Sequence, residues 1–247
     1  MREFGNNTNA RLPVLFLLDA SSSMNGIIRG DNQHIVRQEY ADGINWNIVT
    51  GDNMVTRMDE LNTSLQRFVS DILADPLAKL AADVAVMTFA RTIATVKEFG
   101  PIRESDTGLK ISSSQENETL LGEAVELALA ELDNRKRTYR EHGVEYYQPW
   151  LVVMTDGVPT SARHRELEER LKELSTARKL SVFVFGIGRA DLSELCSISP
   201  GRLPMQINDQ KFPELFAWLS RSVRMASMSV PGDGVSLTPL PDDVWQV

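Results

Sequence analysis

The stretch LPVLFLLDASSSM, residues 12–24, joins a continuous apolar run to an abrupt polar end. A short run of branched and aromatic residues without polar alternation is typical of a buried strand in a parallel sheet. Directly after it come Asp19, Ser21 and Ser23, oxygen-bearing side chains at alternate positions. Polar groups at the end of a buried strand are costly unless something binds them. The stretch therefore predicts a central strand with a binding site at its carboxyl end.

Further segments of the chain have the same apolar character and are expected to be strands of the same sheet. They are ADVAVMTFA (82–90), TIATVKEF (92–99), WLVVMT (150–155), LSVFVFGIG (180–188) and a weaker one, PMQIN (204–208). The first two are joined tightly around Arg91, which predicts a hairpin. We therefore expect one antiparallel strand at an edge of an otherwise parallel sheet.

Between these strands, apolar residues recur at spacings of three and four, as on the buried face of an amphipathic helix. The patterns run from Met54 to Ile72, from Leu121 to Leu132, from Leu167 to Leu174 and from Phe212 to Val223. Strands that alternate with helices form right-handed βαβ units. The sequence therefore predicts an α/β fold with a doubly wound, mostly parallel sheet.

Residues 27–53 interrupt the connection between the first strand and its helix. The pair Asp42-Gly43 lies there between two runs, and the second run alternates apolar residues with asparagines. Asp-Gly between alternating runs is a hairpin signal. We expect an inserted β-hairpin next to the loop that bears the serines. Residues 1–227 otherwise form one domain, and residues 228–247 form a tail too rich in proline and glycine for a helix.

The composition excludes several classes of protein. The chain of 247 residues has a net charge of -8, which argues against non-specific binding to nucleic acid or to an anionic membrane surface. Its single cysteine, Cys196, excludes an internal disulfide, fits a reducing compartment and is expected to be a small buried residue. No apolar run matches a signal peptide or a bilayer span. We expect a cytoplasmic protein.

Two predicted strands end in an aspartate, Asp19 after residues 12–18 and Asp156 after residues 150–155. In a doubly wound sheet, ligands bind beyond the carboxyl ends of the strands, where the strand order reverses. If the two strands are neighbours there, both carboxylates face one crevice. Thr119, just before a predicted helix, is a candidate for a further hydroxyl in the same crevice.

Two carboxylates and several hydroxyls form a site of hard oxygen donors. Such donors suit Mg²⁺, with Mn²⁺ or Ca²⁺ as alternatives, rather than zinc, which favours histidine or cysteine. Where neutral hydroxyls contact the ion directly, the ion keeps much of its positive charge. We therefore expect an open position that binds a Glu or Asp carboxylate of a protein partner.

This pattern resembles the metal-ion-dependent adhesion site (MIDAS) of the von Willebrand factor A (VWA) domain family. The motifs that carry it are LLDASSSM (17–24) and VVMTDGVPT (152–160), and the resemblance extends over about residues 11–225. It implies a Rossmann-like VWA fold and a non-enzymatic, metal-dependent protein-interaction module. The metal-site residues that it implies are Asp19, Ser21, Ser23, Thr119 and Asp156.

Within the family, RLPVLFLLDASSSM (11–24) and FPELFAWLSRSV (212–223) are most similar to the bacterial TerY-type proteins of tellurite-resistance and stress-response operons. That similarity implies a kinase or phosphatase of the same operon as partner. One feature departs from the family, because Glu118 stands before Thr119 where the family commonly has a small residue. A glutamate there is able to disturb the loop, to occlude the metal or to supply an extra ligand. Thr107 and residues 112–114 are other hydroxyl sources nearby.

Two other functions compete with this interpretation. A magnesium-dependent phosphotransferase or phosphatase of the haloacid-dehalogenase type also places an aspartate after its first strand. It usually needs a second aspartate two positions on as acid or base, and Ser21 stands there instead. The other alternative is a scaffold that binds partners through the hairpin and the tail, with a metal that is only structural.

Overall fold

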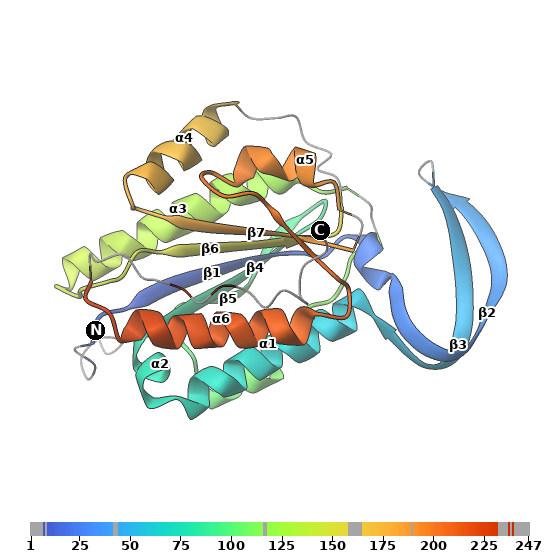
Figure 1. The fold of residues 1–247 in the computed structure, drawn as a ribbon, viewed down its shortest axis with the longest axis horizontal. Helices are drawn as coiled ribbons and strands as arrows, with labels where there is room; N and C mark the ends of the chain where they lie inside the picture. The colour runs from blue at the N-terminus through green and yellow to red at the C-terminus, as the bar shows by residue number, and fades with distance from the viewer. Residues whose placement is uncertain are drawn as a thin grey trace.

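A computed structural model describes residues 7, 9–41, 44–115, 118–157, 165–188, 190–231, 237 and 239 of the chain. A central sheet of six strands has the order β5-β4-β1-β6-β7-β8 (Figure 1). The strands are β1 (Leu12–Asp19), β4 (Ala82–Phe89), β5 (Ile93–Pro101), β6 (Trp150–Thr155), β7 (Ser181–Ile187) and β8 (Met205–Ile207).

The sheet confirms the predicted α/β class and its mixed strand directions. β1 pairs in parallel with β4 on one side and with β6 on the other, and β6, β7 and β8 continue in parallel. Only β5, at the edge, is antiparallel to its neighbour. The chain builds the sheet outward from β1 through β4 and β5 and then returns to place β6 on the other side of β1. The strand order therefore reverses between β1 and β6.

Helices cover both faces of the sheet, as Figure 1 shows. One face carries α1 (Arg57–Ala74), α2 (Pro76–Ala81) and α6 (Phe212–Ser227), and the other carries α3 (Leu121–Glu141), α4 (Arg165–Thr176) and α5 (Leu192–Leu195). Three short 3-10 helices are η1 (Ser22–Asn25), η2 (Glu104–Gly108) and η3 (Cys196–Ile198). The two helical layers explain why β1 is apolar at every position up to Leu18.

Alternate side chains of β1 enter two separate cores. Phe16 packs on the α1/α6 side, where its ring centroid lies 5.1 Å from that of Phe68 and 5.7 Å from that of Phe216. Leu15 and Leu17 belong to the core under α3 and α4. All residues of β1 are buried, so the strand is fixed from both faces and its carboxyl end is held in place.

The inserted hairpin is confirmed and is longer than expected. β2 (Ile27–Ala41) and β3 (Ile44–Thr56) pair antiparallel in a separate two-stranded sheet that extends away from the domain (Figure 1). The predicted turn, Asp42-Gly43, lies outside the described residues. Below, β2 and β3 together are called the ribbon.

The first helix begins at Arg57, so the expectation that Met54 starts it was wrong. Met54 lies in β3. The physical reason is a capping box at Thr56: its hydroxyl accepts from the amide of Asp59, and its own amide donates to the Asp59 carboxylate. Such a pair of bonds fixes a helix start more firmly than apolar spacing does.

The described part of the tail and the single cysteine lie at the periphery of the domain. Leu237 of the tail packs against the core on the α1/α6 side, whereas the rest of the tail from residue 240 on lies outside the described residues. Cys196 is exposed, because it opens the short η3 at the surface, so the expectation of burial was wrong. No helix in the described part of the chain has the length and apolar character to cross a membrane.

Candidate metal site

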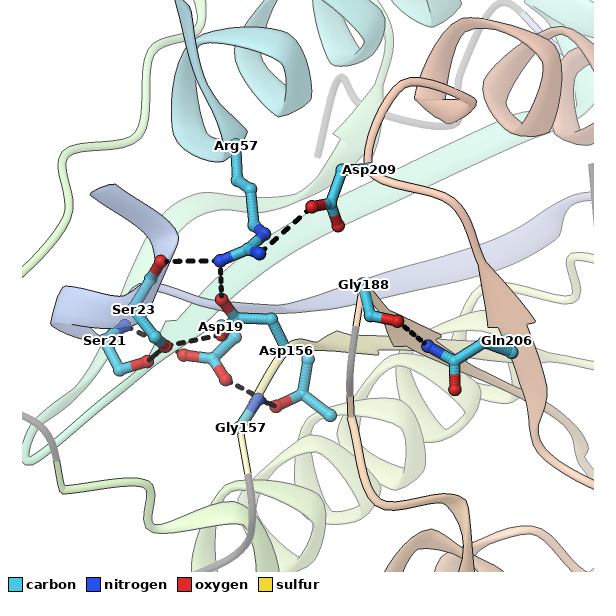
Figure 2. Close-up of polar contacts among 10 residues, drawn as sticks. Asp19, Ser21, Ser23, Arg57, Asp156, Gly157, Gly188, Gln206 and Asp209 are labelled. Atoms are coloured by element: carbon cyan, nitrogen blue, oxygen red, sulfur yellow. Dashed lines mark hydrogen bonds and ion pairs between the residues drawn. The ribbon is translucent and has the colours of Figure 1, made fainter. Parts of the chain in front are cut away.

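The two predicted aspartates lie side by side at the carboxyl ends of adjacent strands. Asp19 is the last residue of β1, and Asp156 directly follows β6. Five register pairs join these strands, from Val14 opposite Trp150 to Leu18 opposite Met154. Figure 2 shows both carboxylates facing the loop that carries Ser21 and Ser23. The strand-order reversal thus gathers the groups that the sequence placed far apart.

Asp19 is completely buried, and the donors to its carboxylate in the described part of the chain are neutral. The Ser21 amide donates to Oδ1 at 2.8 Å, and the Thr155 hydroxyl donates to Oδ2 at 2.5 Å. Burial, followed by the negative charge of Asp156, raises the pKa of Asp19 to about 6. Burial also raises the pKa of Asp156, against the Ser23 hydrogen bond and the Arg57 charge, which lower it. Both carboxylates therefore lack a fully compensating cation.

The two serines are placed by the turn that follows β1. Ser21 precedes η1 and Ser23 lies within it, and their hydroxyl oxygens are 2.9 Å apart. The Ser23 hydroxyl also donates to Asp156 Oδ1 at 2.5 Å. Because the Ser23 hydroxyl donates its hydrogen to the carboxylate, the lone pairs of its oxygen remain available to a cation.

Thr119 lies at the same crevice, just before α3, and is 2% exposed. A Cβ atom added at Gly157 would lie 3.4 Å from Thr119 Oγ1 and 3.7 Å from Asp19 Oδ2. Both oxygens thus border the space beside Gly157. The structure therefore brings all five sequence-predicted side chains to one place, and their binding of a metal stays a prediction.

The other groups considered near Thr119 face elsewhere. Glu118 is exposed, and its carboxylate lies 3.7 Å from the guanidinium of Arg91. The Thr107 hydroxyl donates to a backbone carbonyl in its own turn, and the Ser113 hydroxyl donates to the side chain of Asn25. The partners of Glu118, Thr107 and Ser113 thus lie away from the two aspartates.

An arginine that the sequence reasoning missed completes the cluster. Arg57 Nη1 donates to Asp156 Oδ2 and to the Ser23 carbonyl, both at 3.1 Å, and Nη2 donates to Asp209 Oδ2 at 3.0 Å (Figure 2). Burial disfavours the charged guanidinium, but the hydrogen bond and charge of Asp209 and the charge of Asp156 outweigh it and raise the pKa of Arg57.

Signals for some of the missed residues were present in the sequence. Asp209 follows β8 and is thus a third aspartate just beyond the carboxyl end of a strand. Thr155 is a polar residue at the end of an apolar strand, directly before Asp156. For Arg57 the only signal is a cation at the first position of a helix, where the helix dipole disfavours it.

The donor set fits a hard divalent cation. Two buried carboxylates and several hydroxyls converge, and with Asp209 and Arg57 the cluster contains more negative than positive groups. The described residues contain no group of three or more His, Cys, Asp and Glu side chains arranged to hold a metal. Any ion held here would therefore depend on hydroxyl oxygens, which suits Mg²⁺ better than a soft metal.

The fold is similar to that of several solved structures of low sequence identity. Proximal thread matrix protein 1 from the mussel byssus has a TM-score of 0.55 and 19% identity over 90% of this chain. This chain spans only 47% of that protein. A further structure of the mussel protein, with a zinc-occupied MIDAS motif, has a TM-score of 0.51, 18% identity and the same coverage of both chains. The hypothetical protein BatB from Bacteroides thetaiotaomicron has a TM-score of 0.57 and 16% identity, over 88% of this chain and all of BatB.

Sequence comparison identifies the family. A search of curated proteins finds no match. Residues 46–216, more than half of the chain, match the sequence model of the von Willebrand factor type A domain. The match starts within β3, after the loop of Ser21 and Ser23, so the position of these serines in the site rests on the structure. With the sheet order and the site already described, the chain belongs to the von Willebrand factor type A domain family.

Proposed function

We propose that the chain is a metal-dependent protein-interaction module that binds an acidic residue of a partner protein at Asp19, Ser21, Ser23, Thr119 and Asp156. Domains of this family are generally non-enzymatic and typically bind protein partners through the MIDAS. The observation that carries the proposal is the fully buried Asp19, whose pKa of about 6 reflects burial beside a second carboxylate. Such a pair is stabilised by a cation placed between the carboxylates and the hydroxyls.

The protein side chains have separable roles at this site. Asp156 accepts a hydrogen bond from the Ser23 hydroxyl and Asp19 accepts one from the Ser21 amide, so the aspartates orient the loop that carries the hydroxyls. The serine and threonine oxygens would hold the ion. When bound, the ion supplies a positive charge that attracts a carboxylate. Because that carboxylate must lose its water, we expect modest net affinity that depends on the metal.

Magnesium is the ion that these donors favour, with Mn²⁺ and Ca²⁺ as alternatives. The mussel protein shows that a MIDAS motif can take zinc in a crystal. In this chain the donors are hard oxygens, and none of the five predicted ligands is a histidine or cysteine. We therefore expect Mg²⁺ to be the resident ion at cellular concentrations.

The ribbon would supply a second part of the partner-binding surface. It leaves the domain at Gly26 and returns at Arg57, and the Arg57 amide donates to the Gly26 carbonyl at 2.9 Å. Its base thus lies beside the loop that carries the serines. Farther out, Ile35, Val36 and Tyr40 are exposed apolar side chains. A partner bound to the ion would lie next to the base of the ribbon.

The cellular context of the proposal comes from the sequence alone. On the similarity of residues 11–24 and 212–223 to TerY-type proteins, we propose a role in a tellurite-resistance or stress-response system. The proposed cytoplasmic location rests on the single cysteine, which fits a reducing compartment. The partner would be a kinase or a phosphatase of the same operon. Co-purification of tagged chain from its native host, followed by identification of bound proteins, tests this context separately from metal binding.

Calorimetry tests the metal site directly. Titration of the full chain with Mg²⁺ and Mn²⁺ is expected to show one site, and the double variant Asp19→Ala, Ser21→Ala is expected to show none. Asp133→Ala, which removes an exposed aspartate of α3, is the matched control and should bind like the wild type. Equal affinity in the double variant would refute the assignment.

Two further measurements separate the proposal from its alternatives. Hydrolysis of a generic phosphoester by the purified chain with Mg²⁺ would favour a phosphotransferase or phosphatase, and we expect none because Ser21 occupies the position of the acid–base aspartate. Partner binding that survives a chelator, or that survives Asp156→Ala, would favour the scaffold with a structural metal. We expect binding to be lost in both cases.

A further inference from the structure

We infer that Arg57 is a positioning residue that occupies one oxygen of Asp156 and thereby keeps the bound ion available for an external carboxylate. The inference rests on the proposed function, since it concerns the same site. It assigns a role to a side chain that is neither one of the five predicted ligands nor part of either predicted metal motif. Asp209 acts in turn as the anchor that holds Arg57.

The contacts divide the two oxygens of Asp156 between different donors. Oδ1 accepts from the Ser23 hydroxyl at 2.5 Å, and Oδ2 accepts from Arg57 Nη1 at 3.1 Å. Arg57 Nη1 also donates to the Ser23 carbonyl, so the guanidinium ties Asp156 to the loop of the serines (Figure 2). Asp156 therefore cannot turn both oxygens toward an ion unless it breaks its bond to Arg57.

Two glycines leave the space that this arrangement needs. A Cβ atom at Gly26 would come within 2.5 Å of Arg57 Nη1. Gly188 has a φ of +62°, and a Cβ atom there would collide with Asp209 Oδ1 and lie 3.2 Å from Arg57 Nη2. Side chains at either position would thus push the arginine or its anchor away. The pocket for the guanidinium is built by the backbone from two separate loops.

Two local features of Arg57 are unfavourable for folding, although its ion pairs with Asp209 and Asp156 favour the charged guanidinium. As the first residue of α1, it places a cation where the helix dipole is positive. Its Nε, and Oδ1 of Asp209, are buried without a hydrogen-bond partner within the described part of the chain. An arrangement that leaves buried polar atoms unpaired needs an offsetting benefit. Control of Asp156 at the metal site is such a benefit.

Loss of the guanidinium is expected to change metal and carboxylate binding in opposite directions. Arg57→Gln removes a positive charge beside the site and frees Oδ2 of Asp156, so a metal should bind roughly tenfold more tightly. A freed Asp156 that contacts the ion would neutralise part of its charge. The ion should then bind an external carboxylate several-fold more weakly. Loss of the charge alone would shift both affinities in the same directions, so a variant that keeps the charge is needed to separate positioning from charge.

Water-proton relaxation of Mn²⁺ bound to the full chain measures both effects. The probe is Mn²⁺ alone, and acetate is then titrated in to displace metal-bound water. We expect Arg57→Gln to bind Mn²⁺ more tightly, to show fewer exchangeable waters and to need several-fold more acetate. Arg137→Gln is the matched control, because it removes the same charge from an exposed arginine of α3 that pairs with Glu141, outside the cluster. It should behave like the wild type.

Arg57→Lys keeps the charge, but its single ammonium nitrogen cannot span the three oxygens that the Nη1 and Nη2 atoms of the planar guanidinium reach. We expect it to keep wild-type Mn²⁺ affinity within about twofold and to show part of the acetate effect. If Arg57→Gln does not fold, a wild-type acetate response in Arg57→Lys overturns the inference. In a folded Arg57→Gln, weaker Mn²⁺ binding, no change, or a change equal to that of Arg137→Gln also overturns it. A wild type that binds no Mn²⁺ refutes the proposed function itself.

Discussion

At the scale of single residues, the negative charge of Asp19 is unfavourable for folding when no metal is bound. Burial and the charge of Asp156 raise its pKa from 3.8 to about 6, so the folded state binds its proton more tightly than the unfolded state does. The group therefore destabilises the fold above about pH 6, and this destabilisation is relieved as the pH falls. Asp156, Arg57 and Asp209 are the other charged groups of the cluster.

Asp19→Asn is expected to remove this pH dependence. In chelator, the wild type should gain roughly 1 kcal/mol of unfolding free energy from this group between pH 7 and pH 5, and the variant should lack that gain. Urea unfolding at the two pH values measures the difference. Saturating Mg²⁺ should reverse the trend in the wild type, because the ion binds the charged carboxylate. Equal pH slopes for the two proteins in chelator would contradict the prediction.

A substitution at Gly157 tests whether the ion binds in the space between Thr119 and Asp19. A Cβ atom there meets both side chains only at ordinary contact distances, 3.4 and 3.7 Å, so Gly157→Ala should fold with little loss of stability. The methyl group narrows the crevice, and metal affinity should fall by about tenfold, or about 1.4 kcal/mol. Calorimetry and thermal unfolding check the two parts. Unchanged metal affinity in a folded variant would place the ion elsewhere.

The sequence predicted which ligand candidates meet, but not what surrounds them. Asp19 and Asp156 were predictable because both follow apolar runs, and parallel strands end at the same edge of a sheet. Arg57 was not predictable, because it lies 99 positions from Asp156 in the sequence and directly follows the inserted ribbon. Such a pair depends on how α1 is oriented against the sheet, and no local pattern encodes that orientation.

At the scale of elements, most strands and helices were predictable to within a few residues, and the errors have physical causes. α2 and α5 were missed because each is too short for an apolar period to show. The length of the ribbon was underestimated because the register between its two strands shifts at several points between Ile27 and Arg37. Each shift breaks the alternation that marks a strand.

The ribbon is expected to be dispensable for folding. Replacement of residues 31–50 by a short glycine linker joins two chain segments that already lie opposite each other, since Asp31 pairs with Asp52. The deletion variant should keep its metal affinity and most of its thermal stability, and it should capture the partner less well. Calorimetry, thermal unfolding and partner pull-down measure the three properties. Normal capture by a folded variant would exclude the ribbon from the binding surface.

At the scale of the whole molecule, the aromatic cluster between β1 and the helices α1 and α6 holds the site's main strand. Phe16→Ala should lower the unfolding free energy by about 3 to 5 kcal/mol, because Phe16 is fully buried against Phe68 and Phe216. Leu203→Ala, at a residue 81% exposed, is the control and should change stability by less than about 0.5 kcal/mol. Urea unfolding in chelator measures the unfolding free energy of both variants. A small loss for Phe16→Ala would show that β1 is held chiefly by its strand neighbours.

The hydrogen bond between the Gly26 carbonyl and the Arg57 amide has a kinetic consequence. It closes the domain at the point where the ribbon leaves it, so local opening of the ribbon does not require opening of the sheet. Amide protons of β2 and β3 should therefore exchange with solvent through openings of low free energy, while those of β1 and β6 wait for global unfolding. A partner that settles on the ribbon would slow exchange there first. Mass spectrometry of deuterium uptake would thus locate the partner's contact without a structure of the complex.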